Sequence, residues 1–182
     1  MRNPVRASCA RGNTLFLAVF LCLAPGARTA TPQKKEYLSQ AEAQKIRDAG
    51  MTGPRIVLYA TFAGDRIKKL QYEFAHLDPA DEKRTDRLNN LINAYTGCID
   101  DAADLIDIGI EKQEDIRQGV KALQAQLKDA LPYLQDLAVK GPRRETYKDN
   151  LDDAIEATQD AAKDVDKASK EMAPPPVRRK PQ

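Results

Sequence analysis

The sequence lacks tryptophan, has one histidine, and has few aromatic residues, which make up 5% of its 182 residues. Of its three cysteines, Cys9 and Cys22 precede the expected start of the mature chain, which leaves Cys98. An intramolecular disulfide is thereby excluded, so packing must stabilise the fold. Zinc spacings, dinucleotide loops, phosphate loops and nucleophile elbows are also missing. We therefore expect no catalytic residue, no cofactor and no enzymatic activity.

Acidic residues are missing from the first part of the chain. Arg2, Arg6 and Arg11 make it basic, and an apolar run over residues 15–24 follows. That run is about half the length of a membrane span. A basic start, a short apolar run and small residues after it are typical of a secretory signal peptide, here residues 1–30.

Processing is expected near Ala27–Ala30, where small residues occur. Leu21 precedes Cys22, although a lipoprotein signal would have a small side chain there, so lipidation is disfavoured. The chain contains no Asn-x-Ser/Thr glycosylation acceptor. The sequence thus predicts a secreted or periplasmic protein, and it favours a bacterial periplasm.

A basic surface is lacking in the mature chain. Four of the 29 basic residues lie within residues 1–30, so the remainder has a net charge of −2 against 27 acidic residues. Residues 54–172 hold 18 basic and 24 acidic residues. We expect no binding to nucleic acid, because phosphates require a basic surface. The tail, residues 173–182, is rich in proline and basic residues, which predicts a disordered segment that could weakly contact an envelope surface.

What the sequence has is a seven-residue apolar repeat of helix-forming residues. Between residues 54 and 172, four stripes place apolar residues at alternating spacings of four and three. They cover residues 56–77, 88–106, 116–137 and 147–172. Such stripes indicate amphipathic helices that bury one face. The predicted fold class is all-α, an antiparallel bundle of about four long amphipathic helices with a short N-terminal helix.

Two alternatives accompany this prediction. Residues 55–63 contain β-branched and aromatic residues typical of a strand, but their stripe continues in phase to residue 77. The second and third stripes lack a strong stop signal between them, so one helix of about 50 residues is possible. That rod would overhang the first helix, which favours a turn near residues 109–113.

Turn and capping residues predict where the first helices begin. Ser39 followed by Glu42 has capping-box spacing, which indicates a short helix within the N-terminal arm, residues 31–53. Gly50 can end that helix. The Thr-Gly-Pro sequence at residues 52–54 can start the first long helix.

Three further positions predict later boundaries. Asp78 and the proline after it should end the first long helix, with Asp78 as the N-cap of the second. The Gly-Pro pair at residues 141–142 should end the third helix and open the fourth. Pro132 lies inside the third stripe and should kink or split that helix.

The most tempting catalytic pattern is Glu73-x-x-His76, which has the spacing of a di-iron ligand pair. His76 is the sole histidine, so the second half of such a site cannot form. It also points away from the apolar stripe. We expect His76 to be exposed and to have no catalytic or metal-binding role.

Two bands of carboxylates are weak candidates for divalent-cation binding. The first comprises Asp100, Asp104, Asp107 and Glu111, with Glu114 beyond them. The second band contains Asp149, Asp153, Glu156, Asp160 and Asp164. Neither has the spacing of a calcium-binding loop, and both lie away from the apolar stripes. We interpret them as solvated helix faces and predict no specific metal site.

Several apolar residues lie off the main stripes. On the first helix these include Phe62 and Tyr72, which could pack under the N-terminal arm or contact a partner. Cys98 shares a secondary stripe with Leu91 and Leu105, which predicts a buried thiol.

These features favour an exported, non-enzymatic protein-interaction or structural module of the periplasm or cell envelope. Its partner would be another protein or a second copy of the chain. The alternative is a protein that binds divalent cations or cationic ligands through its acidic helix faces.

Overall fold

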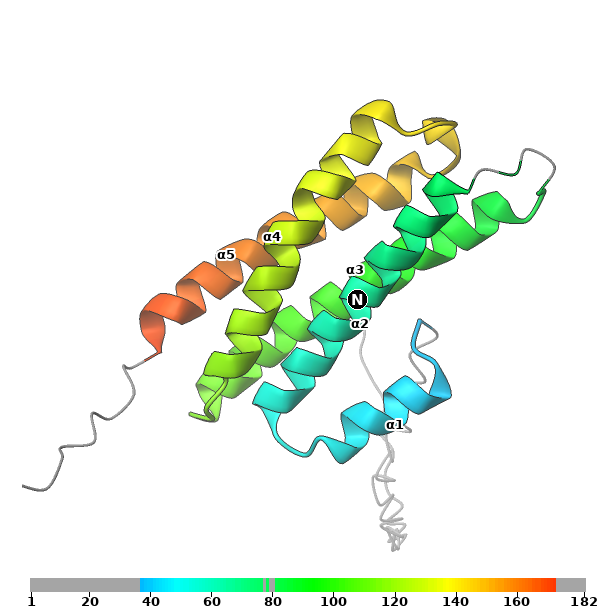
Figure 1. Cartoon of the computed structure of the whole chain (residues 1–182). Coiled ribbons are helices and arrows are strands. Elements are labelled where there is room, and N and C mark those ends of the chain that lie inside the picture. Colours follow the sequence, from blue (N-terminus) through cyan, green and yellow to red (C-terminus); the bar gives the residue numbers. More distant parts are fainter. Residues whose placement is uncertain (1–36, 77, 79–80, 173–182) are drawn as a thin grey trace, which may run out of the picture. The chain divides into compact units, whose positions relative to one another are not determined.

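The computed structural model describes residues 37–76, 78 and 81–172. This part contains five α-helices and no strand, so the all-α prediction is confirmed. The helices are α1 (Gln40–Asp48), α2 (Thr52–Ala75), α3 (Arg84–Glu111), α4 (Arg117–Lys140) and α5 (Lys148–Glu171) (Figure 1). The expected signal peptide and the proline-rich tail lie outside the described residues.

The four long helices form the predicted bundle. Helix α2 lies beside α3 and α4, α5 also lies beside α3 and α4, and α1 packs against α2. Consecutive long helices run in opposite directions (Figure 1). The connection from α3 to α4 therefore crosses the bundle diagonally, and the neighbours α2 and α4 run in the same direction.

The predicted apolar stripes form the core. The second and third stripes are buried along their whole length. The first is buried from Ile56 to Leu70 and the fourth from Tyr147 to Ala168, while Phe74 and Met172 are partly buried at the ends. Residues 55–63 belong to α2, so the strand alternative is wrong. The apolar residues of this segment follow the seven-residue repeat of a helix, and a strand would require them to alternate, so the repeat was the correct guide.

Helices α3 and α4 are separate, as the predicted turn near residues 109–113 requires. Gln113 adopts a positive φ of 56°, and the Glu114 amide donates to the Gly109 carbonyl at 2.9 Å. A Cβ atom on Gly109 would lie 2.4 Å from Cγ2 of Ile116, which folds back over the helix end. The single helix of about 50 residues is therefore wrong, because burying Ile116 requires the chain to reverse.

The start of the described chain follows its capping residues. Ser39 and Glu42 form both hydrogen bonds of the predicted capping box at the start of α1. Gly50 has a φ of +67°, which glycine adopts without strain, and so lets the chain turn into α2. Helix α2 then begins at Thr52, within the predicted Thr-Gly-Pro start.

Two predicted helix starts are wrong. Lys83 precedes α3 instead of Asp78, and the turn is held by Asp81, whose carboxylate accepts from the Lys83 amide at 3.0 Å. Helix α5 begins at Lys148, because Arg143 has a positive φ of 51° and a short 3₁₀ turn (Arg144–Thr146) intervenes. That turn directs Tyr147 into the core, where 1% of it is exposed.

Pro132 does not split its helix. Helix α4 is continuous from Arg117 to Lys140, with Pro132 inside it. Pro132 is exposed on the outer side of the bundle. Water can therefore solvate the carbonyl that loses its donor, which is how an interior proline is tolerated.

A polar contact crosses the middle of the core. The hydroxyls of Tyr95 and Thr158 lie 2.8 Å apart, and both residues are fully buried. The Thr158 hydroxyl also donates to the Ala154 carbonyl. Burial raises the pKa of the Tyr95 phenol. This pair links α3 to α5 at one register, because any sliding of the helices would leave the buried Tyr95 hydroxyl without its partner.

Replacing Thr158 by valine should lower the free energy of unfolding by about 1–3 kcal/mol, since Tyr95 would keep a buried hydroxyl without its partner. Chemical denaturation measures this change. The double variant Thr158→Val, Tyr95→Phe should recover most of the loss, because removing both partners is nearly neutral. A loss of equal size in both variants would contradict the assigned pairing.

Candidate functional site

Residues 37–48, which comprise Tyr37, Leu38 and α1, cover part of the outer side of the α2–α3 pair, and a groove lies open beyond them. On α3, Cys98 lies in the covered part and is fully buried, as predicted. A Cβ atom on Gly97 would lie 2.8 Å from the Tyr37 ring, which therefore rests directly on α3. Leu38 is also buried in the core. Leu91, on the same stripe as Cys98, is partly buried.

An ion pair between Arg66 and Glu42 fastens α1 to α2. The Arg66 guanidinium donates to both carboxylate oxygens of Glu42, with Nη2 to Oε2 at 2.8 Å. It also donates to the carbonyls of Tyr37 at 3.3 Å and Phe62 at 3.4 Å. The exposed fractions of the two side chains are 8% for Arg66 and 17% for Glu42.

The capping box and the ion pair share one carboxylate. Glu42 Oε2 accepts from the amide and the hydroxyl of Ser39, at 2.9 and 2.8 Å, besides Arg66. The hydrogen bonds from Arg66, followed by those from Ser39, lower the pKa of Glu42 to about 2 against the opposing effect of burial. The same pair raises the pKa of Arg66. The Glu42 carboxylate therefore both caps the start of α1 and attaches α1 to α2.

Phe62, one of the two residues singled out for partner contact, lies inside the protein. It is 5% exposed, and the Arg66 guanidinium lies 5.9 Å from its ring centroid. Arg66, which lies over this ring, is bonded to Tyr37 and Glu42 of the N-terminal arm, in keeping with the other explanation that the sequence allowed. In the folded chain Phe62 is not available to a partner.

Tyr72, the second predicted contact residue, is 63% exposed. Its ring stacks on the ring of His76, with centroids 4.1 Å apart and an interplanar angle of 25°. His76 is exposed as predicted, and its Nδ1 lies 2.9 Å from the Tyr72 carbonyl oxygen. The side chain of Glu73 contacts Arg87 instead, at 3.0 Å. The Glu73-His76 spacing thus forms no joint site.

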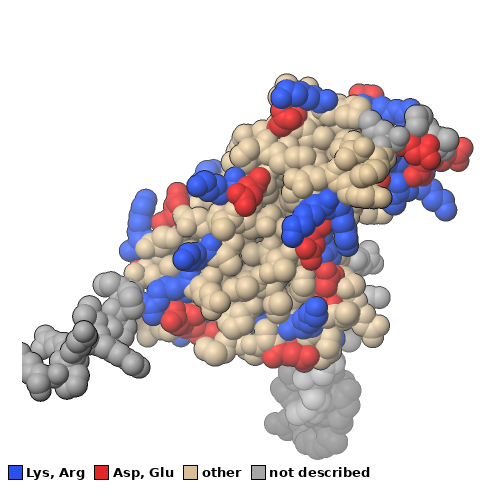
Figure 2. Space-filling model, in the orientation of Figure 1, with Lys and Arg blue, Asp and Glu red and all other residues tan. Residues whose placement is uncertain are grey.

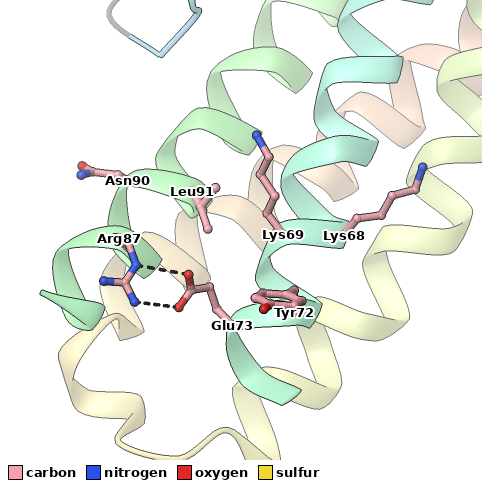
Figure 3. A pocket seen from close by; sticks show the side chains of 7 residues that line it. All are labelled: Lys68, Lys69, Tyr72, Glu73, Arg87, Asn90 and Leu91. Atoms are coloured by element: carbon pink, nitrogen blue, oxygen red, sulfur yellow. Dashed lines mark hydrogen bonds and ion pairs between the residues drawn. The ribbon is translucent and has the colours of Figure 1, made fainter. Parts of the chain in front are cut away.

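Beyond α1, the groove between α2 and α3 is open. It encloses about 470 Å³ and is lined by Lys68, Lys69, Tyr72, Glu73, Arg87, Asn90 and Leu91. Figure 3 shows the Glu73–Arg87 pair at one end, Leu91 near the middle and the Lys69 side chain rising at the other end. The apolar surface of Leu91 and Tyr72 thus lies between cationic side chains.

The three cations that line this open groove differ in how closely carboxylates neutralise them. Arg87 forms ion pairs with Glu73 at 3.0 Å and with Asp81, and these hydrogen bonds raise the pKa of Arg87. Lys68 lies 3.9 Å from Asp65, a long and exposed contact of little energetic weight. Lys69 has no ion pair with any described residue. Of the three cations that line the groove, Lys69 is therefore the least neutralised by neighbouring carboxylates.

The first carboxylate band is spread along α3. Asp100, Asp104, Asp107 and Glu111 are exposed, although neighbouring atoms partly desolvate Asp100. This desolvation, followed by the charge of Asp104, raises the pKa of Asp100. Glu114 leaves the band: its carboxylate accepts from the Thr52 amide at 2.8 Å and caps α2. Within residues 37–76, 78 and 81–172, no three acidic, histidine or cysteine side chains converge as metal ligands.

The second band lies on α5 and mixes with lysines. Lys148 contacts Asp152 at 2.6 Å, and Lys163 contacts Asp160 at 2.7 Å. Figure 2 shows Lys and Arg interspersed with Asp and Glu over the face of the bundle that it presents. None of the described helices is long and apolar enough to span a membrane.

The sequence pointed to Tyr72 but not to the lysines, Asn90 or Arg87 beside it. Their grouping depends on how α2 and α3 align, which the stripes alone do not reveal. The signal that was available is the secondary stripe of Leu91 and Cys98. Comparison of the chain with known protein families, characterised proteins and solved structures gives no match.

Proposed function

We propose that this chain is an exported, non-enzymatic protein-interaction or structural module of the periplasm or cell envelope. The observation that carries the proposal is the open groove between α2 and α3, with the exposed Tyr72 ring at its edge. Tyrosine and arginine are enriched in protein interfaces, and a tyrosine ring buries a large area at little cost in entropy.

The bundle suits this role because its core is filled by the four stripes. Leu123, Leu134 and Leu151 are among the side chains that are fully buried. A densely packed bundle presents its outer side chains on a rigid support, so a partner can bind without ordering the scaffold.

Export is the part of the proposal that depends on residues 1–30. The intact mass of the protein purified from its native cells should correspond to a chain that begins near Ala27–Ala30. A full-length mass, or one that retains residues 1–30, would remove export from the proposal while leaving the groove unaffected.

Tyr72 should contact a specific partner. With a photo-crosslinking amino acid in place of Tyr72, illumination of cells that make the full chain should yield one dominant, saturable crosslinked protein. The same amino acid in place of the exposed Lys121 on α4 is the matched control and should yield little. Equal, diffuse crosslinking from both positions would count against an interaction module.

Self-association is one form of the proposal. A crosslinked product with twice the mass of the chain would identify a second copy as the partner, and sedimentation would then show a concentration-dependent dimer. The basic tail is a separate candidate for weak contact with an anionic envelope surface. Sedimentation with anionic vesicles, with and without residues 178–180, measures that contact.

The alternative function is binding of divalent cations or cationic ligands by the carboxylate bands. Its support is the row of exposed carboxylates along α3, Asp100, Asp104, Asp107 and Glu111, whose mutual repulsion a bound cation would relieve. Calorimetry with Ca²⁺ distinguishes the two functions. A saturable heat that the Asp104→Asn variant loses would favour the alternative, and a non-saturable heat would remove it.

A further inference from the structure

We propose that the open half of the α2–α3 groove binds an acidic amphipathic segment of a partner protein, in the manner in which the covered half holds α1. This inference rests on the proposed function and specifies the chemistry of the partner.

The covered and open halves lie along the same faces of α2 and α3. On α2, residues Phe62, Arg66, Lys69 and Glu73 follow at spacings of four, three and four, so they share one face of the helix. On α3, Leu91 and Cys98 are seven residues apart and also share a face. Figure 3 shows the open half bounded by the same two helices.

Helix α1 shows what the covered half accepts. Glu42 of α1 presents a carboxylate to a cation on α2, and Leu38, just before α1, places an apolar side chain in the core. Both groups come from the first residues of one amphipathic segment. The covered half therefore recognises acidic and apolar groups together.

The open half offers the same pair of features to an incoming segment. Lys69 lies one helical turn beyond Arg66 on α2, and Leu91 lies two turns before Cys98 on α3. Tyr72 adds an aromatic ring at the edge. A segment with a carboxylate and a nearby apolar side chain would pair with Lys69 and pack on Leu91 and Tyr72.

The sign of the local charge selects an acidic partner. Three cations, Lys68, Lys69 and Arg87, and one carboxylate, Glu73, line the open half. The surrounding body has an excess of acidic residues, so long-range attraction does not assist an acidic ligand. We therefore expect the affinity to depend on local contacts, chiefly at Lys69, and to fall as salt increases.

The dimensions of the groove suit a helix. A volume of about 470 Å³ holds several side chains but is open along its length. Recognition of an amphipathic helix in a groove needs anchors on one face at spacings of three, four and seven residues. These anchors belong to the bound helix, so we expect the partner segment to carry its carboxylate and its apolar side chains at these spacings.

The probe is a synthetic amphipathic helix of about four turns with leucine and glutamate on one face. Fluorescence anisotropy with the full mature chain should show saturable binding. Lys69→Glu should weaken the affinity at least tenfold, and Tyr72→Ala several-fold. Lys121→Glu is the matched control, because it makes the same charge change on the exposed side of α4, and should alter affinity less than twofold. A peptide with lysine in place of glutamate should not bind.

Circular dichroism of each variant checks that the bundle is folded, which is expected because both Lys69 and Lys121 are exposed. Equal affinity for the Lys69→Glu and Lys121→Glu variants would overturn the proposal. Equal binding of the lysine peptide would do the same. The proposal would also be overturned if the peptide competes with α1 for its site. In that case the peptide affinity would fall in the Arg66→Lys variant and stay unchanged in the Lys69→Glu variant.

Two further results separate this inference from the proposed function. A dominant protein crosslinked from Tyr72, together with no binding of the acidic peptide, would overturn the acidic specificity and keep the interaction module. Loss of both signals would overturn both. If the protein crosslinked from Tyr72 is a second copy of this chain, the groove serves self-association. That result would overturn the proposal that the acidic segment belongs to a different protein.

Discussion

Replacing Arg66 by alanine should lower the free energy of unfolding by about 3 kcal/mol, because the carboxylate of Glu42 would remain partly buried without its cation. The loss should fall first on α1, which the pair fastens to α2. Hydrogen exchange should therefore show faster exchange of the α1 amides than of those in α3 and α5. Chemical denaturation measures the total change.

The same pair makes stability depend on pH. The pKa of Glu42 falls from 4.5 to about 2 on folding, so the folded state favours the ionised carboxylate. Its contribution is fully present above pH 4.5 and is lost as the pH falls toward 2. The size of the shift corresponds to about 3 kcal/mol. Denaturation midpoints between pH 2 and 6 should show this loss.

Glu42→Gln is the matched control for the pH experiment. It keeps the size of the side chain and removes its titration, so the variant should be less stable at pH 6 and less sensitive to pH below 4.5. Parallel pH profiles for the natural chain and Glu42→Gln would contradict the role given to this carboxylate. By contrast, the exposed ion pair of Lys140 and Asp136 should contribute little to the free energy of unfolding or to its pH dependence.

Replacing Gly119 by valine should lower the free energy of unfolding by about 2–3 kcal/mol. Helices α2 and α4 approach closely near their first turns. A Cβ atom on Gly119 would lie 2.8 Å from the Gly53 carbonyl oxygen and 2.8 Å from Cβ of Ile56. The helices would have to move apart, since the first of these neighbours is backbone and cannot rotate away.

Gly64→Val is the matched control for that substitution. A Cβ atom on Gly64, in α2, meets the flexible end of the Gln126 side chain at 2.5 Å, and that amide can swing aside. Helix propensity slightly favours valine over glycine, so the change should stay within about 0.5 kcal/mol. Thermal denaturation of both variants tests the difference. Equal losses at the two positions would show that close approach of α2 and α4 is not the cause.

The heptad stripes carried most of the fold prediction. Each core position from Leu88 to Ile106, and from Ile116 to Leu137, is buried as its spacing predicts. The boundary predictions were less successful, because they assumed that one nearby residue sets each helix end. Asp78 is not the N-cap of α3, and α2 is capped by Glu114, which is 62 residues away along the chain.

The candidate site could be predicted only in part. Tyr72 lies off the apolar stripe and is exposed, which spacing alone indicated. Phe62 also lies off the stripe, yet it is buried, with the Arg66 guanidinium over its ring. Both positions look alike along α2, and the difference depends on the ion pair that holds α1 at Arg66, which spacing along one helix does not reveal.

The sequence by itself determined that the chain is helical and which faces of the helices are buried, and it favoured the turn after α3. These features follow from local spacing, because apolar residues at every third or fourth position share one face of a helix, and that face must be buried to remove them from water. The tertiary structure decided which helices are neighbours, where Gly119 meets Gly53, and which half of the groove stays open. Those features depend on pairs of residues far apart in the chain, whose distances are fixed when the helices pack.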